Sequence, residues 1–212
     1  MPAPPAALMP ERLDTGEKRS PAITTGPASA RPAAVLVLVV PSADAPHADA
    51  DGGADAADAV AEIVLIRRVD RGGHHAGDIA LPGGRFEPSD AGSAAAAALR
   101  EAAEEVGLDP VAAGVRVIGE LEPFWIPISD YRVTPVLAIA DRRPVLTAAP
   151  DEVAEVLTVP LAAFLPGSPI EMVETEIRGI HLHFGAYPVG PLRVWGATAR
   201  ILGQLGAILG PG

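Results

Sequence analysis

The chain has 212 residues, no cysteine and a formal net charge of −11 at pH 7. Without cysteine there is no disulfide framework and no thiol chemistry, which is compatible with the cytoplasm. The negative charge argues against general binding to nucleic acid or to a membrane surface, because phosphate backbones and anionic lipids would be repelled. No stretch reaches the roughly 18 uninterrupted apolar residues of a membrane span, and the N-terminus lacks the pattern of a signal peptide. We expect a cytoplasmic protein with one folded domain and a small-molecule substrate.

The first part of the chain predicts a tail and then a hairpin. Residues 1–32 are rich in Pro, Ala, Ser and Thr and show no apolar periodicity, so we expect a mobile, disordered tail before a domain spanning residues 33–212. Two apolar runs, Ala34–Val40 and Glu62–Arg67, read as antiparallel strands. The acidic low-complexity segment between them, residues 42–58, is longer than compact hairpins use, and we expect it to be disordered.

A short helix with three glutamates follows a glycine-rich turn. Ser93 is placed to cap this helix and Gly107 to end it. Glu101, Glu104 and Glu105 fall on one stripe, because residues three and four apart are neighbours on a helix. Like charges there cost stability unless a cation lies among them, and hard oxygen ligands indicate Mg²⁺ or Mn²⁺. The alternative for three glutamates taken alone is a solvated acidic face.

After this helix the pattern returns to strands and closes on a second helix. Strands are predicted at residues 115–122, 132–140, 152–159, 170–178 and 181–187. The apolar spacing of residues 195–209 suits an amphipathic helix, although the glycines in it lower helix propensity. Strands interrupted by two well-separated helices favour an α/β (α+β) fold, an α/β/α sandwich around a mixed β-sheet.

The segment from Leu81 to Leu108 resembles the Nudix box, whose general form is G-x5-E-x7-R-E-U-x-E-E-x-G-U with U aliphatic. Arg100-Glu-Ala-Ala-Glu-Glu-Val-Gly-Leu108 fits the second half at every specified position. In the first half, Asp90 stands where the pattern has Glu, and nine residues rather than seven separate it from Arg100. The resemblance implies the same sandwich fold and a metal-dependent diphosphatase, with homodimers common in the family.

Hydrolysis of a phosphoanhydride needs a positioned water, cations that absorb charge on the phosphate oxygens, and a base. Glu101 and Glu105 supply a ligand face, with Glu104 beside them as a further ligand or as the base that orients the water. Arg100 reads as an orienting partner rather than a catalyst. By resemblance, the Gly84 carbonyl is a further metal ligand, and a carboxylate outside the box completes the site. The candidates for that carboxylate are Glu152 and Glu155, with Glu120 and Glu122 as weaker ones, and solvent-facing positions are the alternative for all four.

Residues 68–84 resemble the signature of the coenzyme A pyrophosphatase branch of the Nudix enzymes. Arg68, His75, Gly77 and Pro82-Gly-Gly84 match it, whereas Gly72-Gly73 replaces a Leu-Arg pair, Leu81 replaces Phe and Glu87-Pro88 replaces Asp-Pro. Residues 132–136, 151–161 and 195–202 also look like this branch. The resemblance implies cleavage of coenzyme A, or acyl-coenzyme A, to 3',5'-ADP and 4'-phosphopantetheine.

Three side chains are candidates for substrate contacts, namely Arg68, His75 and Arg85. The alternatives are solvation of a hairpin end for the arginines and a turn-stabilising hydrogen bond for His75. Two other functions remain open: a Nudix pyrophosphatase for ADP-ribose or a dinucleotide, and a non-catalytic Nudix module that binds a nucleotide as a regulator. The complete Arg-Glu-x-x-Glu-Glu set favours an enzyme, because a pure binder has no need of a whole cation site.

Overall fold

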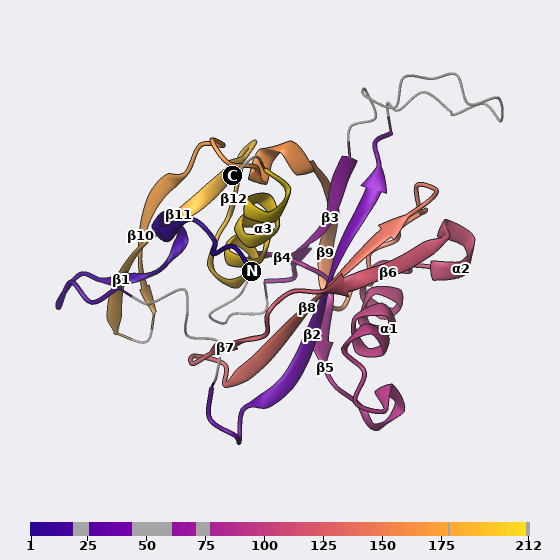
Figure 1. Ribbon diagram of the computed structural model, residues 1–212, viewed down its shortest axis with the longest axis horizontal. Coiled ribbons are helices and arrows are strands. Elements are labelled where there is room, and N and C mark those ends of the chain that lie inside the picture. Colours follow the sequence, from indigo (N-terminus) through magenta and orange to yellow (C-terminus); the bar gives the residue numbers. More distant parts are fainter. Residues whose placement is uncertain (19–25, 44–60, 71–76, 178, 211–212) are drawn as a thin grey trace.

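The structure is a computed structural model, and it describes residues 1–18, 26–43, 61–70, 77–177 and 179–210 (Figure 1). His75, Gly72-Gly73 and most of the predicted acidic loop lie outside these residues. Within the described residues, no helix is long and apolar enough to cross a membrane.

A large mixed sheet forms the centre of the molecule. Its strands lie in the order β4-β3-β2-β8-β6, with β5 attached to β2, β7 to β8 and β9 to β3. Strand β2 runs parallel to β8 and antiparallel to β3, where Val39 lies opposite Ile63, so the predicted hairpin pairing is confirmed. The bounds are β2 Arg31–Pro41, β3 Ala61–Arg68, β4 Ile79–Ala80, β5 Gly83–Arg85, β6 Val115–Glu120, β7 Phe124–Ile126, β8 Tyr131–Ala140 and β9 Val153–Pro160.

Helices cover both faces of this sheet. On one face, α1 (Ala94–Val106) packs its small side chains against the strands, so that Ala98 and Ala102 meet Leu36 and Val136 in one buried cluster. On the other face, α3 (Gly196–Leu209) packs in a second cluster that includes Val37 and Leu65. Because β2 is buried on both faces, it reads as a continuous apolar run. The predicted α/β/α sandwich around a mixed sheet is confirmed (Figure 1).

Short turns and helices connect these layers. The 3₁₀ turn η3 (Pro88–Asp90) precedes α1, the short helix α2 (Pro110–Ala113) follows it, and the 3₁₀ turn η4 (Leu161–Phe164) follows β9. The cap of α1 is as predicted, because the Ser93 hydroxyl accepts a hydrogen bond from the Ala96 N–H at 3.2 Å. Its end is also as predicted, since Gly107 adopts a left-handed φ of 65°.

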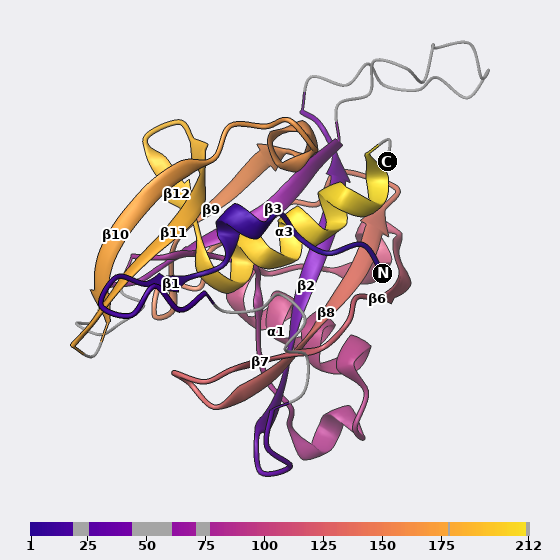
Figure 2. The same cartoon turned by 60° about the vertical axis from the view of Figure 1, so that its left-hand side comes forward.

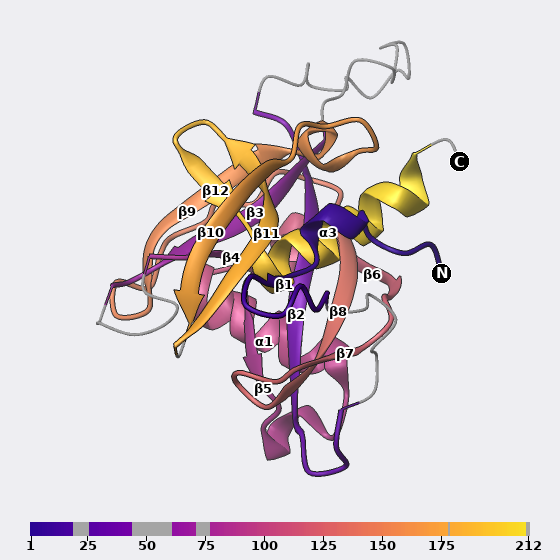
Figure 3. The same ribbon diagram turned by 90° about the vertical axis from the view of Figure 1, so that its left-hand side faces the viewer.

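A second, smaller sheet stands beside the main one (Figure 3). It consists of β10 (Glu171–Ile177), β11 (Ile180–Val189), β12 (Leu192–Val194) and β1 (Glu11–Arg12). The hairpin of β10 and β11 matches two predicted strands, but their separation from the main sheet was not predicted.

The expectation of a mobile N-terminal tail is wrong for residues 1–18. Residues Ala6–Leu8 form a 3₁₀ turn, η1, and β1 pairs with β11, with Glu11 opposite His183. Leu8 and Met9 are buried. The Pro- and Ala-rich composition is typical of disorder, but two large apolar side chains are enough to anchor this segment on α3 (Figure 2).

The glycines of α3 make that packing possible. A side chain at Gly203 would collide with Leu8 and Pro5 of the N-terminal segment, and one at Gly206 would overlap the backbone carbonyl of Phe164 in η4. Both glycines lower helix propensity, yet each lets a neighbouring segment approach the helix backbone closely. The C-terminal helix is therefore stabilised by its contacts rather than by its sequence alone.

Candidate active site

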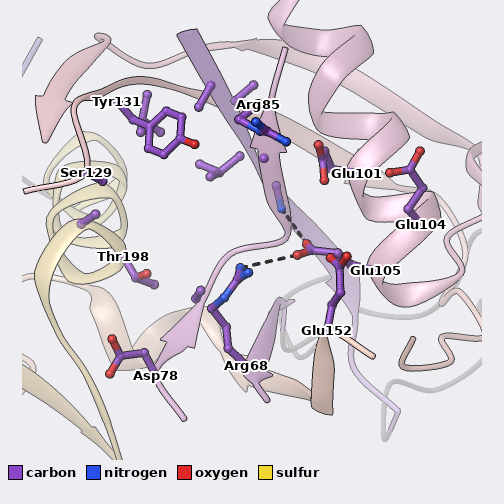
Figure 4. A pocket seen from close by; sticks show the side chains of 18 of the residues that line it. Arg68, Asp78, Arg85, Glu101, Glu104, Glu105, Ser129, Tyr131, Glu152 and Thr198 are labelled. Carbon is purple, nitrogen blue, oxygen red and sulfur yellow. Dashed lines mark hydrogen bonds and ion pairs between the residues drawn. The ribbon is translucent and has the colours of Figure 1, made fainter. Parts of the chain in front are cut away.

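A cavity of about 890 Å³ opens between the N-terminal end of α3 and the glutamate face of α1 (Figure 4). Its lining combines most of the predicted site residues: Gly84, Arg68, Arg85, Glu101, Glu104, Glu105 and Glu152. Strands β2, β4 and β5 form its floor, so residues distant in sequence meet in one place.

Glu105 is the most deeply placed carboxylate of this cavity. Its side chain is only 2% exposed, although it accepts a hydrogen bond from the Gly83 N–H at 2.8 Å and lies 3.6 Å from Arg68 Nη1. Burial raises the pKa of Glu105 to about 7, against the opposing effects of the Gly83 hydrogen bond and of Arg68. Arg68 and the Gly83 hydrogen bond do not offset the cost of burying this carboxylate. A bound metal cation would supply the missing positive charge.

Glu101 lies one turn earlier on α1 and faces Gly84. Its carboxylate occupies the space that a side chain at position 84 would fill, so a larger residue there would displace the Glu101 carboxylate from its present place. Burial is also the main cause that raises the pKa of Glu101, with Arg100 opposing it and with Glu104 and Glu152 adding repulsion. Glu101, Glu105 and Glu152 thus form one electrostatically coupled group.

Arg100 organises the outer part of the stripe, as predicted. Its guanidinium donates to Asp90 through Nε and Nη2, at 3.1 Å each, and to the Arg85 carbonyl at 2.8 Å. Its Nη1 contacts Glu101 at 3.0 Å and Glu104 at 3.1 Å. Arg100 therefore ties the glycine-rich turn to α1.

The same contacts give Asp90 a role. This carboxylate is buried, accepts a hydrogen bond from the Glu87 N–H at 2.7 Å and pairs with Arg100, whose hydrogen bond lowers the pKa of Asp90. The shorter side chain serves at this position because η3 brings its backbone close to Arg100. Directly after η3, Ala91 adopts a left-handed φ of 48° in the turn that leads to α1.

The oxygen donors of the cavity suit a hard divalent cation such as Mg²⁺ or Mn²⁺. In this conformation, however, no three acidic or imidazole side chains of the described residues lie at the spacing of a closed metal cluster. Arg100 holds Glu101 and Glu104 on one side, and Glu105 is bound to Gly83. The donor chemistry fits a cation, and the carboxylates would have to converge on it.

The fold separates the two candidate carboxylates at the start of β9, Glu152 just before the strand and Glu155 within it. Glu152 lines the cavity, but Glu155 does not, because it pairs with Arg67 at 3.0 Å. A β-bulge places Arg67 opposite Glu155 and Arg68 opposite Val153, so the two arginines serve different carboxylates. The expectation that Glu155 belongs to the site is therefore not met. Glu120 and Glu122 do not line the cavity either.

Sequence reasoning missed the wall opposite the glutamates. That wall includes Ser129, Tyr131 and the start of α3, from Trp195 to Thr198. A signal for the last segment was present, because Trp195-Gly-Ala-Thr stood among the stretches that resemble the coenzyme A branch.

Comparison with known proteins identifies the family of the chain. Residues 47–178 match the model of the NUDIX domain. The chain belongs to the Nudix family.

Relatives of this Nudix protein include bacterial proteins described as uncharacterized Nudix hydrolase NudL. The protein of Cronobacter sakazakii is 38% identical over 148 residues, which cover 70% of this chain and 75% of the relative. That of Escherichia coli K12 is 40% identical over 136 residues, 64% of this chain and 69% of the relative. Among solved structures, the Nudix hydrolase RenU from M. smegmatis aligns with a TM-score of 0.46 at 21% identity, over 73% of this chain and 80% of its own.

Family membership establishes the general activity. The Nudix protein is a hydrolase of the diphosphatase type that acts on nucleoside diphosphate-linked small molecules, and such hydrolases generally need divalent metal ions.

Proposed function

We propose that this Nudix hydrolase cleaves coenzyme A or acyl-coenzyme A to 3',5'-ADP and (acyl-)4'-phosphopantetheine. The observation that carries the proposal is the coenzyme A-like signature of residues 68–84, which includes Arg68 and Pro82-Gly-Gly84. Support comes from the position of both parts in the cavity, where Arg68 lies against Glu105 and the Gly83 N–H donates to the same carboxylate. The signature residues thus contact the glutamate stripe that would carry the chemistry.

In the proposed reaction, a water oxygen attacks one phosphorus of the diphosphate and the bridging P–O bond breaks. Each product then keeps one phosphate of the diphosphate, and the nucleotide product carries it in addition to its 3'-phosphate. Glu101, Glu105 and the Gly84 carbonyl would hold Mg²⁺ or Mn²⁺, which when bound would offset the charge that develops on the phosphate oxygens. Arg85, exposed at the rim of the cavity, and Arg68 are the cationic side chains that would meet the phosphates.

The base that takes the proton of the water is proposed to be Glu152. Glu104 is 59% exposed and engaged by Arg100. Glu152 lines the cavity, is electrostatically coupled to Glu101 and Glu105, and has no ion pair among the described residues. A carboxylate that is not neutralised by an arginine is the better proton acceptor.

A substrate panel tests the proposal. The purified protein is incubated with coenzyme A, ADP-ribose and a dinucleotide, each with Mg²⁺, with Mn²⁺ and with chelator, and the products are identified by mass spectrometry. Metal-dependent release of 3',5'-ADP from coenzyme A, in preference to the other two substrates, is the expected result. If only ADP-ribose or only the dinucleotide is turned over, that compound is the substrate and the coenzyme A proposal fails. If none of the three is turned over, a nucleotide-binding module is favoured.

A further inference from the structure

The N-terminus of α3 opens into the cavity on the wall opposite the glutamates. Gly196, Ala197 and Thr198 line the cavity there, while Glu101 and Glu104 line it from α1 (Figure 4). The two ends of the cavity therefore differ in character: one presents carboxylates, and the other presents the first turn of a 14-residue helix.

The backbone donors of this first turn have no partners within the helix. The first helical hydrogen bond runs from the Ala199 N–H to the Trp195 carbonyl, which leaves the N–H groups of residues 196–198 without intrahelical acceptors. The cap residue, Trp195, makes no side-chain hydrogen bond that would replace them. No other hydrogen bond to these groups occurs within the described residues.

Thr198 adds a side-chain donor at the same place. The residue is only 8% exposed, and its hydroxyl makes no hydrogen bond to the residues that the structure describes. Figure 4 shows this side chain at the end of α3, on the cavity wall. Thr198 lines the cavity, so the cavity is the side from which an acceptor can reach this hydroxyl.

We propose that the N-terminus of α3 and the Thr198 hydroxyl bind a phosphomonoester group of the substrate. Backbone N–H donors, the positive end of a helix dipole and a hydroxyl together favour a ligand rich in acceptors and negative charge. Asp78 lines the same side of the cavity and opposes an anion, so binding depends on these particular donors rather than on a general positive field.

The phosphomonoester is assigned to the ribose of the nucleotide. The diphosphate has to reach the carboxylates of α1, where its cation would be held, so the group at the opposite wall is a different part of the same molecule. In coenzyme A that part is the 3'-phosphate. This assignment rests on the proposed function, but the anion site itself can be measured without turnover.

Two measurements test the site with Thr198→Val, which removes the hydroxyl at nearly constant shape. The first is the ratio of kcat/KM for coenzyme A to kcat/KM for 3'-dephospho-coenzyme A. The second is calorimetric binding of 3',5'-ADP and of 5'-AMP without metal. In both, the wild type is expected to prefer the 3'-phosphorylated ligand, and Thr198→Val to reduce that preference about tenfold, the effect of one hydrogen bond to a charged group.

Controls separate this role from a structural one. Thr198→Ser keeps the hydroxyl and is expected to retain the preference, and Thr175→Val removes a hydroxyl from β10, outside the cavity, and is expected to leave it unchanged. Thermal melting of each variant shows whether it is folded.

The outcomes also separate this inference from the proposed function. If coenzyme A is hydrolysed but Thr198→Val leaves the preference for the 3'-phosphate at the wild-type value, the inference is overturned. If coenzyme A is not hydrolysed, the proposed function fails, and the binding measurement decides alone: a Thr198-dependent preference for 3',5'-ADP supports the anion site, and equal binding of 3',5'-ADP and 5'-AMP refutes it.

Discussion

Glu105 makes the stability of the metal-free protein depend on pH. The ordinary pKa of its carboxyl group is 4.5, and burial raises the pKa to about 7 in the folded protein. Between these values, the folded chain binds a proton at Glu105 that the unfolded chain does not, so stability falls as the pH rises. The raised pKa of Glu105 adds about 3 kcal/mol to the free energy of unfolding below pH 4.5. This stabilisation is lost as the pH rises past 7.

The test compares wild type with Glu105→Gln in chelator, by denaturant unfolding at pH 5 and pH 8. Glutamine stays neutral, and its carbonyl can still accept the Gly83 hydrogen bond, so the variant lacks only the titration. The difference in unfolding free energy between the two proteins should shift by about 2.5 kcal/mol in favour of Glu105→Gln from pH 5 to pH 8. Titrating groups that do not interact with Glu105 cancel in this difference.

Metal binding should reverse the effect at high pH. A divalent cation that binds the ionised carboxylate stabilises the folded wild type by mass action, and stabilises Glu105→Gln much less. An unfolding free-energy difference that stays the same at pH 5 and pH 8 would refute the reasoning, because it would mean that Glu105 titrates alike in both states.

Three further predictions concern other parts of the fold and site. Arg100→Ala removes the side chain that ties the glycine-rich turn to α1, and should lower the melting temperature by about 5 °C or more, with Arg100→Lys between it and the wild type; an unchanged melting curve would contradict this role. Gly206→Ala should cost about 2 kcal/mol in denaturant unfolding because a neighbouring carbonyl occupies the space, whereas Gly119→Ala, which has open space, should cost less than half as much; equal costs would disprove the packing argument. Glu152→Gln should lower kcat about 100-fold or more while Glu155→Gln changes it by less than about twofold, and the reverse order would move the base to Glu155.

The parts of the fold that could be predicted are those with a local pattern. The apolar runs of β2 and β3, the Ser93 cap and the Gly107 end of α1 each depend on neighbouring residues, and each is found where expected. The anchoring of the N-terminus could not be predicted, because Leu8 is buried only by an apolar surface that residues nearly 200 positions later provide.

The same distinction applies to the site. The spacing of Glu101, Glu104 and Glu105 is local, so the stripe was visible in the sequence. Which of Glu152 and Glu155 enters the cavity depends on the bulge between β3 and β9, a feature of strand pairing that the sequence does not display. The wall at Thr198 was hidden for the same reason, since it becomes part of the site only when α3 packs across the sheet from α1.

Product analysis of coenzyme A hydrolysis by the wild type and by a Glu101→Gln/Glu105→Gln variant, each with Mg²⁺ and with Mn²⁺, tests the central claim most directly. The account predicts that the wild type releases 3',5'-ADP and 4'-phosphopantetheine, and that the folded variant is slower by about 1000-fold or more. A variant as active as the wild type, or a wild type that releases neither product with either metal, would contradict it.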